Sequence, residues 1–99
     1  MNITVTQNDH TAQITLRGRF DFKCHREFRN ACDGALARPG IATVEIDLAD
    51  VEYLDSSALG MLLLARERAG GRGLRLANCR GTVEEVLRIA NFQKLFEIR

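Results

Sequence analysis

The chain has 99 residues and a formal net charge of +1, from 14 Lys and Arg against 13 Asp and Glu. This length predicts one domain over residues 1–99, since a domain usually takes roughly 100–200 residues. Balanced charge argues against direct nucleic-acid binding, which needs a concentrated basic face. The longest apolar run, Leu59–Ala65, is interrupted by Gly60 and is far shorter than the roughly 18 residues that cross a bilayer. We therefore expect a cytoplasmic protein that makes no membrane contact.

Two short strands are predicted at the start of the chain. Apolar and polar residues alternate over Asn2–Thr6 and again over Thr11–Arg17, which is the period of a half-buried strand. The polar segment Gln7–His10 between them is typical of a hairpin turn, and Gly18 ends the second strand. These segments predict an antiparallel pair.

A helix, a strand and a connector are predicted next. Asp21 is predicted to cap the helix or lie next to its cap, and Pro39-Gly40 is predicted to follow the end of the helix. Ala42–Leu48 alternates as a strand, followed by a connector over Ala49–Leu54. The apolar stripe that predicts the helix consists of Cys24, Phe28, Ala31, Cys32 and Ala35.

The second half of the chain predicts two more helices around a strand. Asp55-Ser56-Ser57 begins a helix that Gly70-Gly71 ends, and a strand follows from Leu74 to Cys79. Thr82-Val83-Glu84-Glu85 has the capping-box pattern and opens the last helix. Phe96–Arg99 is compatible with a terminal strand. The residues placed on the inward side of the middle helix are Leu59, Leu62, Leu63 and Arg66.

The order β-β-α-β-α-β-α, with a final strand at Phe96–Arg99, predicts an α/β fold. The opening pair is antiparallel and the later strands follow crossovers, so the sheet is mixed, with four to five strands. Right-handed crossovers place the helices mainly on one face.

The residue types needed for common enzyme sites are absent or isolated. The sequence has no GxxxxGK[ST] loop, no GxGxxG after a strand and no GxSxG elbow. His10 and His25 have no predicted nucleophile beside them. The three cysteines, at positions 24, 32 and 79, lack metal-site spacing, so we expect reduced packing thiols, no metal and no cofactor.

The segment Asp55-Ser56-Ser57 places hydroxyls at the entrance of a nearly all-apolar helix. The first turn of a helix carries unpaired N–H groups and a positive dipole end, where a phosphoserine can be accommodated. Phosphorylation adds about −1.5 to −2 charges and can repel a partner. Alternatively, Asp55 or Ser56 simply caps the helix.

Asp55-Ser56-Ser57-Ala58-Leu59-Gly60, after a strand, resembles the signature of STAS domains, in particular the bacterial anti-sigma factor antagonists. Gly18-Arg19-Phe20-Asp21 resembles a second landmark of that family, and the tail Asn91–Phe96 is also similar. The resemblance covers nearly all of the chain and implies a single STAS domain.

The resemblance implies a regulator of transcription that works by partner switching. Such an antagonist binds an anti-sigma factor with serine-kinase activity, is released when that kinase phosphorylates it, and is reset by a metal-dependent serine phosphatase. Carried over, Ser56 is the phosphate acceptor, Asp55 and Ser57 flank it, and Asp21 belongs to the adjacent binding surface. The ATP would belong to the kinase, and the chain itself would not be an enzyme.

Two positions depart from the family pattern. Arg19 replaces an acidic residue, and Ala58 replaces the glycine after the serine pair. Neither change removes the acceptor hydroxyl, so both bear on the identity of the partner more than on the mechanism.

Two other functions remain open. One is a STAS adaptor subunit of an ABC-type lipid transporter, which need not be phosphorylated. The other is a phosphocarrier or enzyme that uses Asp55 as an acyl-phosphate acceptor. Such a site needs further carboxylates and a lysine, and Lys23 and Lys94 are the only lysines.

Met61 and Leu64 are predicted to lie away from the centre of the inward side of their helix. Apolar residues on an exposed helix face beside a polar switch are typical of a protein interface. We therefore expect both in the docking surface, with burial of the helix on both sides as the alternative.

Overall fold

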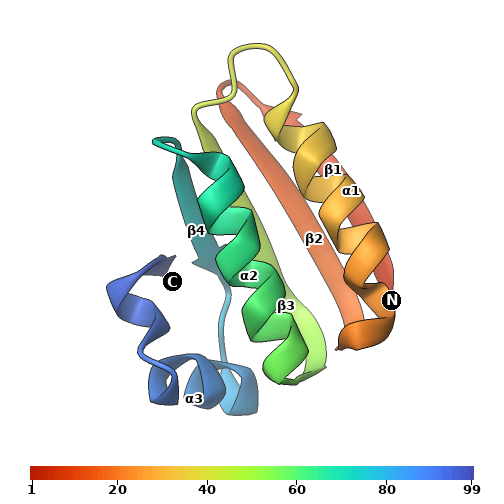
Figure 1. Ribbon diagram of the computed structural model, residues 1–99, viewed down its shortest axis with the longest axis vertical. Coiled ribbons are helices and arrows are strands. Elements are labelled where there is room, and N and C mark those ends of the chain that lie inside the picture. Colours follow the sequence, from red (N-terminus) through yellow and green to blue (C-terminus); the bar gives the residue numbers. More distant parts are fainter.

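A five-stranded sheet carries three helices in the computed structural model, which describes residues 1–99 (Figure 1). The strands are β1 (Asn2–Asn8), β2 (Thr11–Phe20), β3 (Thr43–Leu54), β4 (Gly73–Ala77) and β5 (Glu97–Ile98). The helices are α1 (His25–Leu36), α2 (Ser56–Ala69) and α3 (Gly81–Ile89), with short 3₁₀ turns at Phe22–Cys24 and Phe92–Lys94. The predicted α/β order is confirmed, including the terminal strand.

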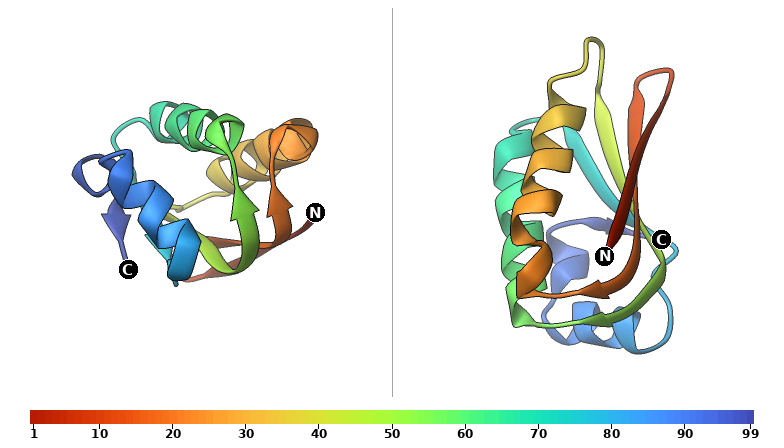
Figure 2. Two further views of the ribbon diagram at one scale, coloured as in Figure 1. Left: turned by 90° about the horizontal axis from the view of Figure 1, so that it is seen from below. Right: turned by 90° about the vertical axis from the view of Figure 1, so that its right-hand side faces the viewer.

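The strands lie in the sheet in the same order as in the chain, from β1 to β5. β1 pairs antiparallel with β2, and all other pairs are parallel, so the sheet is mixed as predicted. α1 and α2 lie side by side on one face, and α3 lies across the lower end of the view in Figure 1 (Figures 1 and 2). No helix is both long enough and apolar enough to cross a membrane.

β2 and β3 are longer than predicted and curve toward the helices at their carboxyl ends (Figure 2, right). Their parallel register shifts between Thr15 and Arg17 and again between Gly18 and Arg19. Such irregularities bend a strand and raise its twist. Gly18 has a φ of +105°, a conformation that favours glycine. The expected connector at Ala49–Leu54 is therefore wrong: the segment is the bent end of β3.

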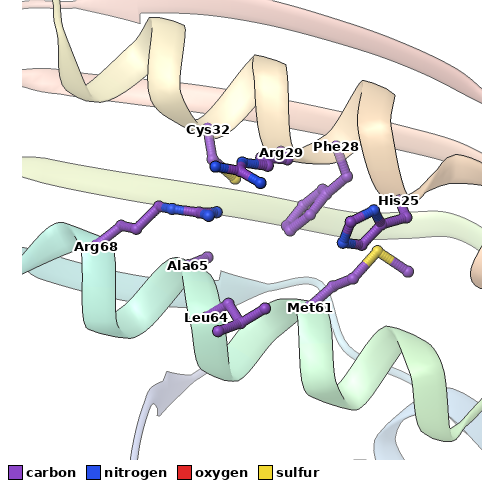
Figure 3. A pocket seen from close by; sticks show the side chains of 8 residues that line it. All are labelled: His25, Phe28, Arg29, Cys32, Met61, Leu64, Ala65 and Arg68. Atoms are coloured by element: carbon purple, nitrogen blue, oxygen red, sulfur yellow. The ribbon is translucent and has the colours of Figure 1, made fainter.

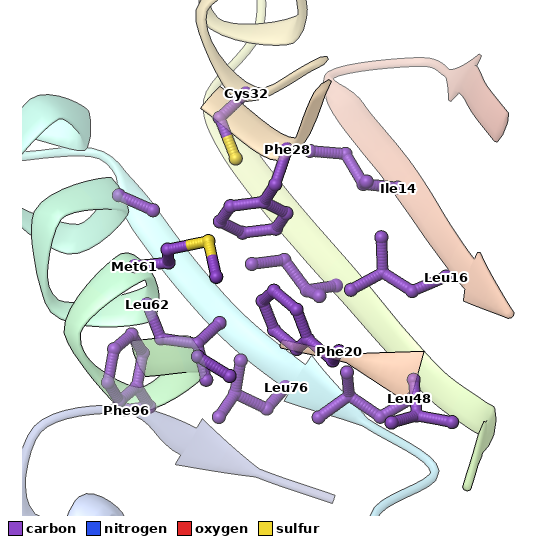
Figure 4. Close-up of a cluster of buried hydrophobic side chains, with 14 of the residues drawn as sticks. Ile14, Leu16, Phe20, Phe28, Cys32, Leu48, Met61, Leu62, Leu76 and Phe96 are labelled. Carbon is purple, nitrogen blue, oxygen red and sulfur yellow. The ribbon is translucent and has the colours of Figure 1, made fainter. Parts of the chain in front are cut away.

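The core lies between the sheet and the helices, as the close-up in Figure 4 shows. Ile14 and Leu16 from β2 meet Phe28 from α1 and Leu62 from α2, and all four are at most 2% exposed. The rings of Phe20 and Phe28 pack with centroids 5.0 Å apart. This shared core fixes the two helices against the curved strand ends.

The inward side of α2 differs from the prediction. Its buried residues are Ala58, Met61, Leu62, Ala65 and Ala69, whereas Leu63 is 41% exposed. The helix is therefore rotated by about 90° from the expected orientation, taking 3.6 residues per turn. The apolar run of this helix is nearly continuous, so the sequence pattern did not indicate which side is buried.

The start of α3 also differs from the prediction. The helix begins at Gly81, and the residue that precedes it, Arg80, makes no side-chain cap bond. The predicted capping box from Thr82 is therefore wrong. Cys79 is buried but lies beyond the end of β4 at Ala77.

Candidate functional site

The two sequence motifs meet at the carboxyl ends of neighbouring strands. Phe20 at the end of β2 pairs in register with Leu54 at the end of β3. The backbone N–H of Asp55 donates a hydrogen bond to the Phe20 carbonyl at 3.4 Å. Asp21 and Asp55, each the residue that follows its strand, are therefore held side by side at one edge of the domain.

Asp55 caps α2. Its backbone is extended, and its carboxylate Oδ1 accepts a hydrogen bond from the Ala58 N–H at 2.9 Å. Ser56, the first helical residue, is exposed, whereas Ser57 is half-buried and Ala58 is fully buried. Because Asp55 supplies the cap, the Ser56 hydroxyl is not needed for it, and Ser56 is exposed at the surface.

The methyl group of Ala58 has a structural role that glycine could not fill. The residue is 0% exposed and belongs to the core cluster. This departure from the family pattern thus adds a methyl group from the first turn of α2 to the core.

Asp21 begins the 3₁₀ turn before α1. Its Oδ1 accepts a hydrogen bond from the Lys23 N–H at 3.0 Å, and its Oδ2 lies 3.8 Å from Nε of Arg19. The Arg19 guanidinium also lies over the Tyr53 ring, 4.1 Å from its centroid. The second departure from the family pattern, Arg19, thus bridges a carboxylate and an aromatic ring near the predicted acceptor.

Two exposed aromatic residues near this edge were missed by the sequence analysis. Phe22 is 73% exposed in the 3₁₀ turn that follows Asp21, and Tyr53 is 42% exposed near the end of β3. Aromatic residues and arginine are enriched at protein interfaces. The spacing of residues around Asp21 carries no signal for the exposure of Phe22, because that exposure depends on the path of the 3₁₀ turn.

Met61 and Leu64 do not share one environment. Leu64 is 45% exposed, in line with a place on a docking face, but Met61 is 5% exposed and belongs to the core. The expectation that Met61 points away from the core is wrong, because α2 is rotated relative to the predicted orientation.

The three cysteines are free and buried. Burial raises the pKa of each thiol, to about 12 for Cys32 and about 11 for Cys79. Such thiols are protonated and unreactive at neutral pH. No group of three or more His, Cys, Asp or Glu side chains is arranged to hold a metal ion.

The fold and this site define an α/β domain that presents a serine at the amino end of its central helix. Residues 3–97 match the model of the family described as "Mlab, STAS domain". The chain belongs to the STAS-domain family.

A curated relative and several solved structures are similar to this chain. A STAS-domain containing protein of Pseudomonas aeruginosa strain UCBPP-PA14 is 47% identical over 87 residues, which cover 86% of this chain and 84% of the relative. An anti-sigma factor antagonist from Mycobacterium paratuberculosis has a TM-score of 0.88 at 22% identity, covering 98% of this chain and 83% of that one. The phosphorylated form of Bacillus SpoIIAA has a TM-score of 0.74 at 17% identity, covering 99% and 91%. At these identities the structures show a shared fold.

Proposed function

We propose that this chain is an anti-sigma factor antagonist that regulates transcription by partner switching. Unphosphorylated, it binds an anti-sigma factor with serine-kinase activity; phosphorylated on Ser56, it is released. The observation that carries the proposal is the exposure of Ser56 at the first position of α2, beside a cap supplied by Asp55. The structural likeness to antagonists, one of them solved in a phosphorylated form, supports it.

A phosphate at Ser56 would change the charge of this edge more than its shape. It adds about −1.5 to −2 charges next to Asp55, and Asp21 follows the neighbouring strand. The Asp55 carboxylate already accepts a hydrogen bond from the Ala58 N–H. The phosphate would have to compete with Asp55 for this donor. The added negative charge thus faces the docking partner and favours its release.

The other components of the switch are proteins that act on this chain. The kinase binds the ATP that donates the phosphate, and a metal-dependent serine phosphatase removes the phosphate. The proposed switch operates in the cytoplasm. In this proposal the chain itself catalyses no reaction, holds no cofactor and does not contact nucleic acid. Asp21, Asp55, Ser57 and Leu64 surround or flank the surface that the kinase recognises.

A second candidate function is that of a STAS adaptor subunit of an ABC-type lipid transporter. The family model that the chain matches favours this second candidate, because the model is described as "Mlab, STAS domain" and its description does not mention an anti-sigma factor antagonist. In that role Ser56 would remain unmodified and the same surface would bind a constant partner.

Phosphate mapping distinguishes the candidates. The chain is incubated with an anti-sigma factor kinase and ATP, and in parallel isolated from its native host, and both samples are analysed by peptide mass spectrometry. Phosphate on Ser56, absent from Ser56→Ala, supports the switch. If the chain stays unmodified while the same kinase phosphorylates its known substrate in a control reaction, the result favours the adaptor. A base-labile phosphate on Asp55 would indicate the acyl-phosphate alternative.

A further inference from the structure

A shallow groove runs between α1 and α2 on the helical face of the domain (Figure 3). Its floor is apolar and belongs to the core: Phe28 and Cys32 come from α1, and Met61 and Ala65 from α2. The groove has room for only about one water molecule. A small-molecule ligand would find too little enclosed space there, so any occupant must lie across the rim.

The rim combines one apolar side chain with cationic groups. Leu64 is 45% exposed beside the buried floor. Arg29 from α1 and Arg68 from α2 reach the same opening, as Figure 3 shows, and His25 stands at its end near Met61.

The charges at the rim do not cancel. Oδ2 of Asp33 lies 3.8 Å from Nε of Arg29, and Oδ1 of Asp33 lies 3.7 Å from Nε of Arg68. One carboxylate therefore pairs with two guanidinium groups. All three side chains stay partly exposed, at 54%, 47% and 31% for Arg29, Asp33 and Arg68. The formal charges of Arg29, Arg68 and Asp33 therefore sum to +1, next to the exposed Leu64.

We propose that this groove docks an acidic amphipathic helix of a protein partner. An apolar side chain of that helix packs on Leu64 across the groove, and its carboxylates pair with Arg29 and Arg68. Laying the apolar face of a helix into a groove is a common mode of recognition, and opposite charges at the rim select the partner. The proposal rests on the proposed function only for the premise that this chain binds a protein.

Two synthetic helical peptides test the charge complementarity. They share length and leucine positions, but one carries glutamate and the other lysine on its polar face. Each is titrated into isotope-labelled wild-type protein, with no kinase or phosphate present, and followed by NMR. The glutamate peptide should shift the signals of Leu64, Ala65 and Arg68, and the lysine peptide should leave them in place.

Neighbouring leucines on α2 provide a matched pair of variants. Leu64→Gln should weaken binding of the glutamate peptide about fivefold or more, equivalent to about 1 kcal/mol. Leu63 has nearly the same exposure, 41%, but does not line the groove, so Leu63→Gln should bind within about twofold of wild type. Arg68→Glu should reverse the preference in favour of the lysine peptide.

The proposal would be overturned by equal binding of both peptides, by binding of neither, by shifts centred away from the groove, or by equal weakening by Leu63→Gln and Leu64→Gln. A wild-type dimer that Leu64→Gln converts to a monomer would assign the groove to a second copy of the chain and would overturn it too. Circular dichroism checks that each variant is folded, and Leu64→Ala replaces any unfolded Leu64→Gln. Because none of these measurements involves Ser56, their failure is distinguishable from failure of the phosphorylation switch.

Discussion

Asp55 and Ala58 are joined by a hydrogen bond of 2.9 Å from the Ala58 N–H to the Asp55 carboxylate. One partner in this bond is half-buried at the surface and the other is completely buried in the core. The bond therefore joins the start of α2 to the core and at the same time sets the positions of the two serines between them, Ser56 and Ser57.

Removal of this cap should destabilise the domain without unfolding it. We expect Asp55→Ala to lower the free energy of unfolding by about 1 kcal/mol, because the Ala58 N–H loses its acceptor. Asp55→Asn keeps an acceptor oxygen and should retain most of the stability. Urea denaturation followed by circular dichroism measures both variants, and equal stability of Asp55→Ala and wild type would show that the cap bond contributes nothing.

Ser56→Ala should abolish phosphorylation while keeping the fold and the binding to the anti-sigma factor. The side chain is exposed and does not supply the helix cap, so the free energy of unfolding should change by no more than about 0.5 kcal/mol. Ser57→Ala is the control and should still be phosphorylated. Detection of the phosphate on Ser57 would contradict the assignment of the acceptor.

Ser56→Asp and Ser56→Glu should weaken the complex with the anti-sigma factor. Each adds one negative charge next to Asp55, which imitates part of the charge of a phosphate. Ser56→Asn and Ser56→Gln match them in size without the charge and should bind more tightly than the acidic pair. Isothermal titration calorimetry with the cognate anti-sigma factor provides the comparison. Similar affinities for charged and uncharged variants would argue against release by charge.

Met61→Ala and Leu64→Ala should differ sharply in stability although they lie three residues apart. Met61 is 5% exposed, so its truncation leaves a cavity and should cost about 2–5 kcal/mol. Leu64 is 45% exposed, and its truncation should stay within about 0.5 kcal/mol of wild type. Denaturant unfolding tests the pair, and a loss of about 2 kcal/mol or more for Leu64→Ala would place Leu64 in the core.

Stability should fall as the pH rises above about 9. Burial raises the pKa of Cys32 from 9.0 to about 12 and that of Cys79 to about 11, so the folded state keeps protons that the unfolded state releases. The stabilisation is complete below pH 9 and is lost as the pH rises through the folded-state pKa values. Cys32→Ala should show a shallower decline between pH 9 and 11 than wild type. If the stability of Cys32→Ala and of wild type declined equally with pH, the pKa of the Cys32 thiol would not be raised by burial.

The strands with one regular period were predictable from sequence, and the bent ones only in part. Ile14 and Leu16 alternate with polar residues because their strand has a buried and an open face. In β3 the buried residues change phase after Leu48, and the next buried positions are Val51 and Leu54. This change of phase follows from the pairing of β3 with the irregular end of β2. The alternation of residues within β3 alone cannot predict it.

The position of the candidate acceptor was predictable, and the faces around it were not. A capping carboxylate before an apolar run is a local signal, so Asp55 and the start of α2 were placed correctly. Which side of α2 is buried depends on its packing against the rest of the domain, which is a tertiary property. The exposure of Phe22 depends on the path of the 3₁₀ turn after Asp21 and could not be inferred from spacing.

The identical order of the strands in the chain and in the sheet has a consequence for how the domain is assembled. No strand has to be inserted between two strands that precede it, because each pairs with its predecessor in the chain. During synthesis from the amino terminus, β3 can join the β1–β2 hairpin as soon as α1 has folded back, and β4 can then join β3. The sheet therefore grows at a single edge. In an incomplete chain that edge stays unpaired until the next strand of the sequence is available to pair with it.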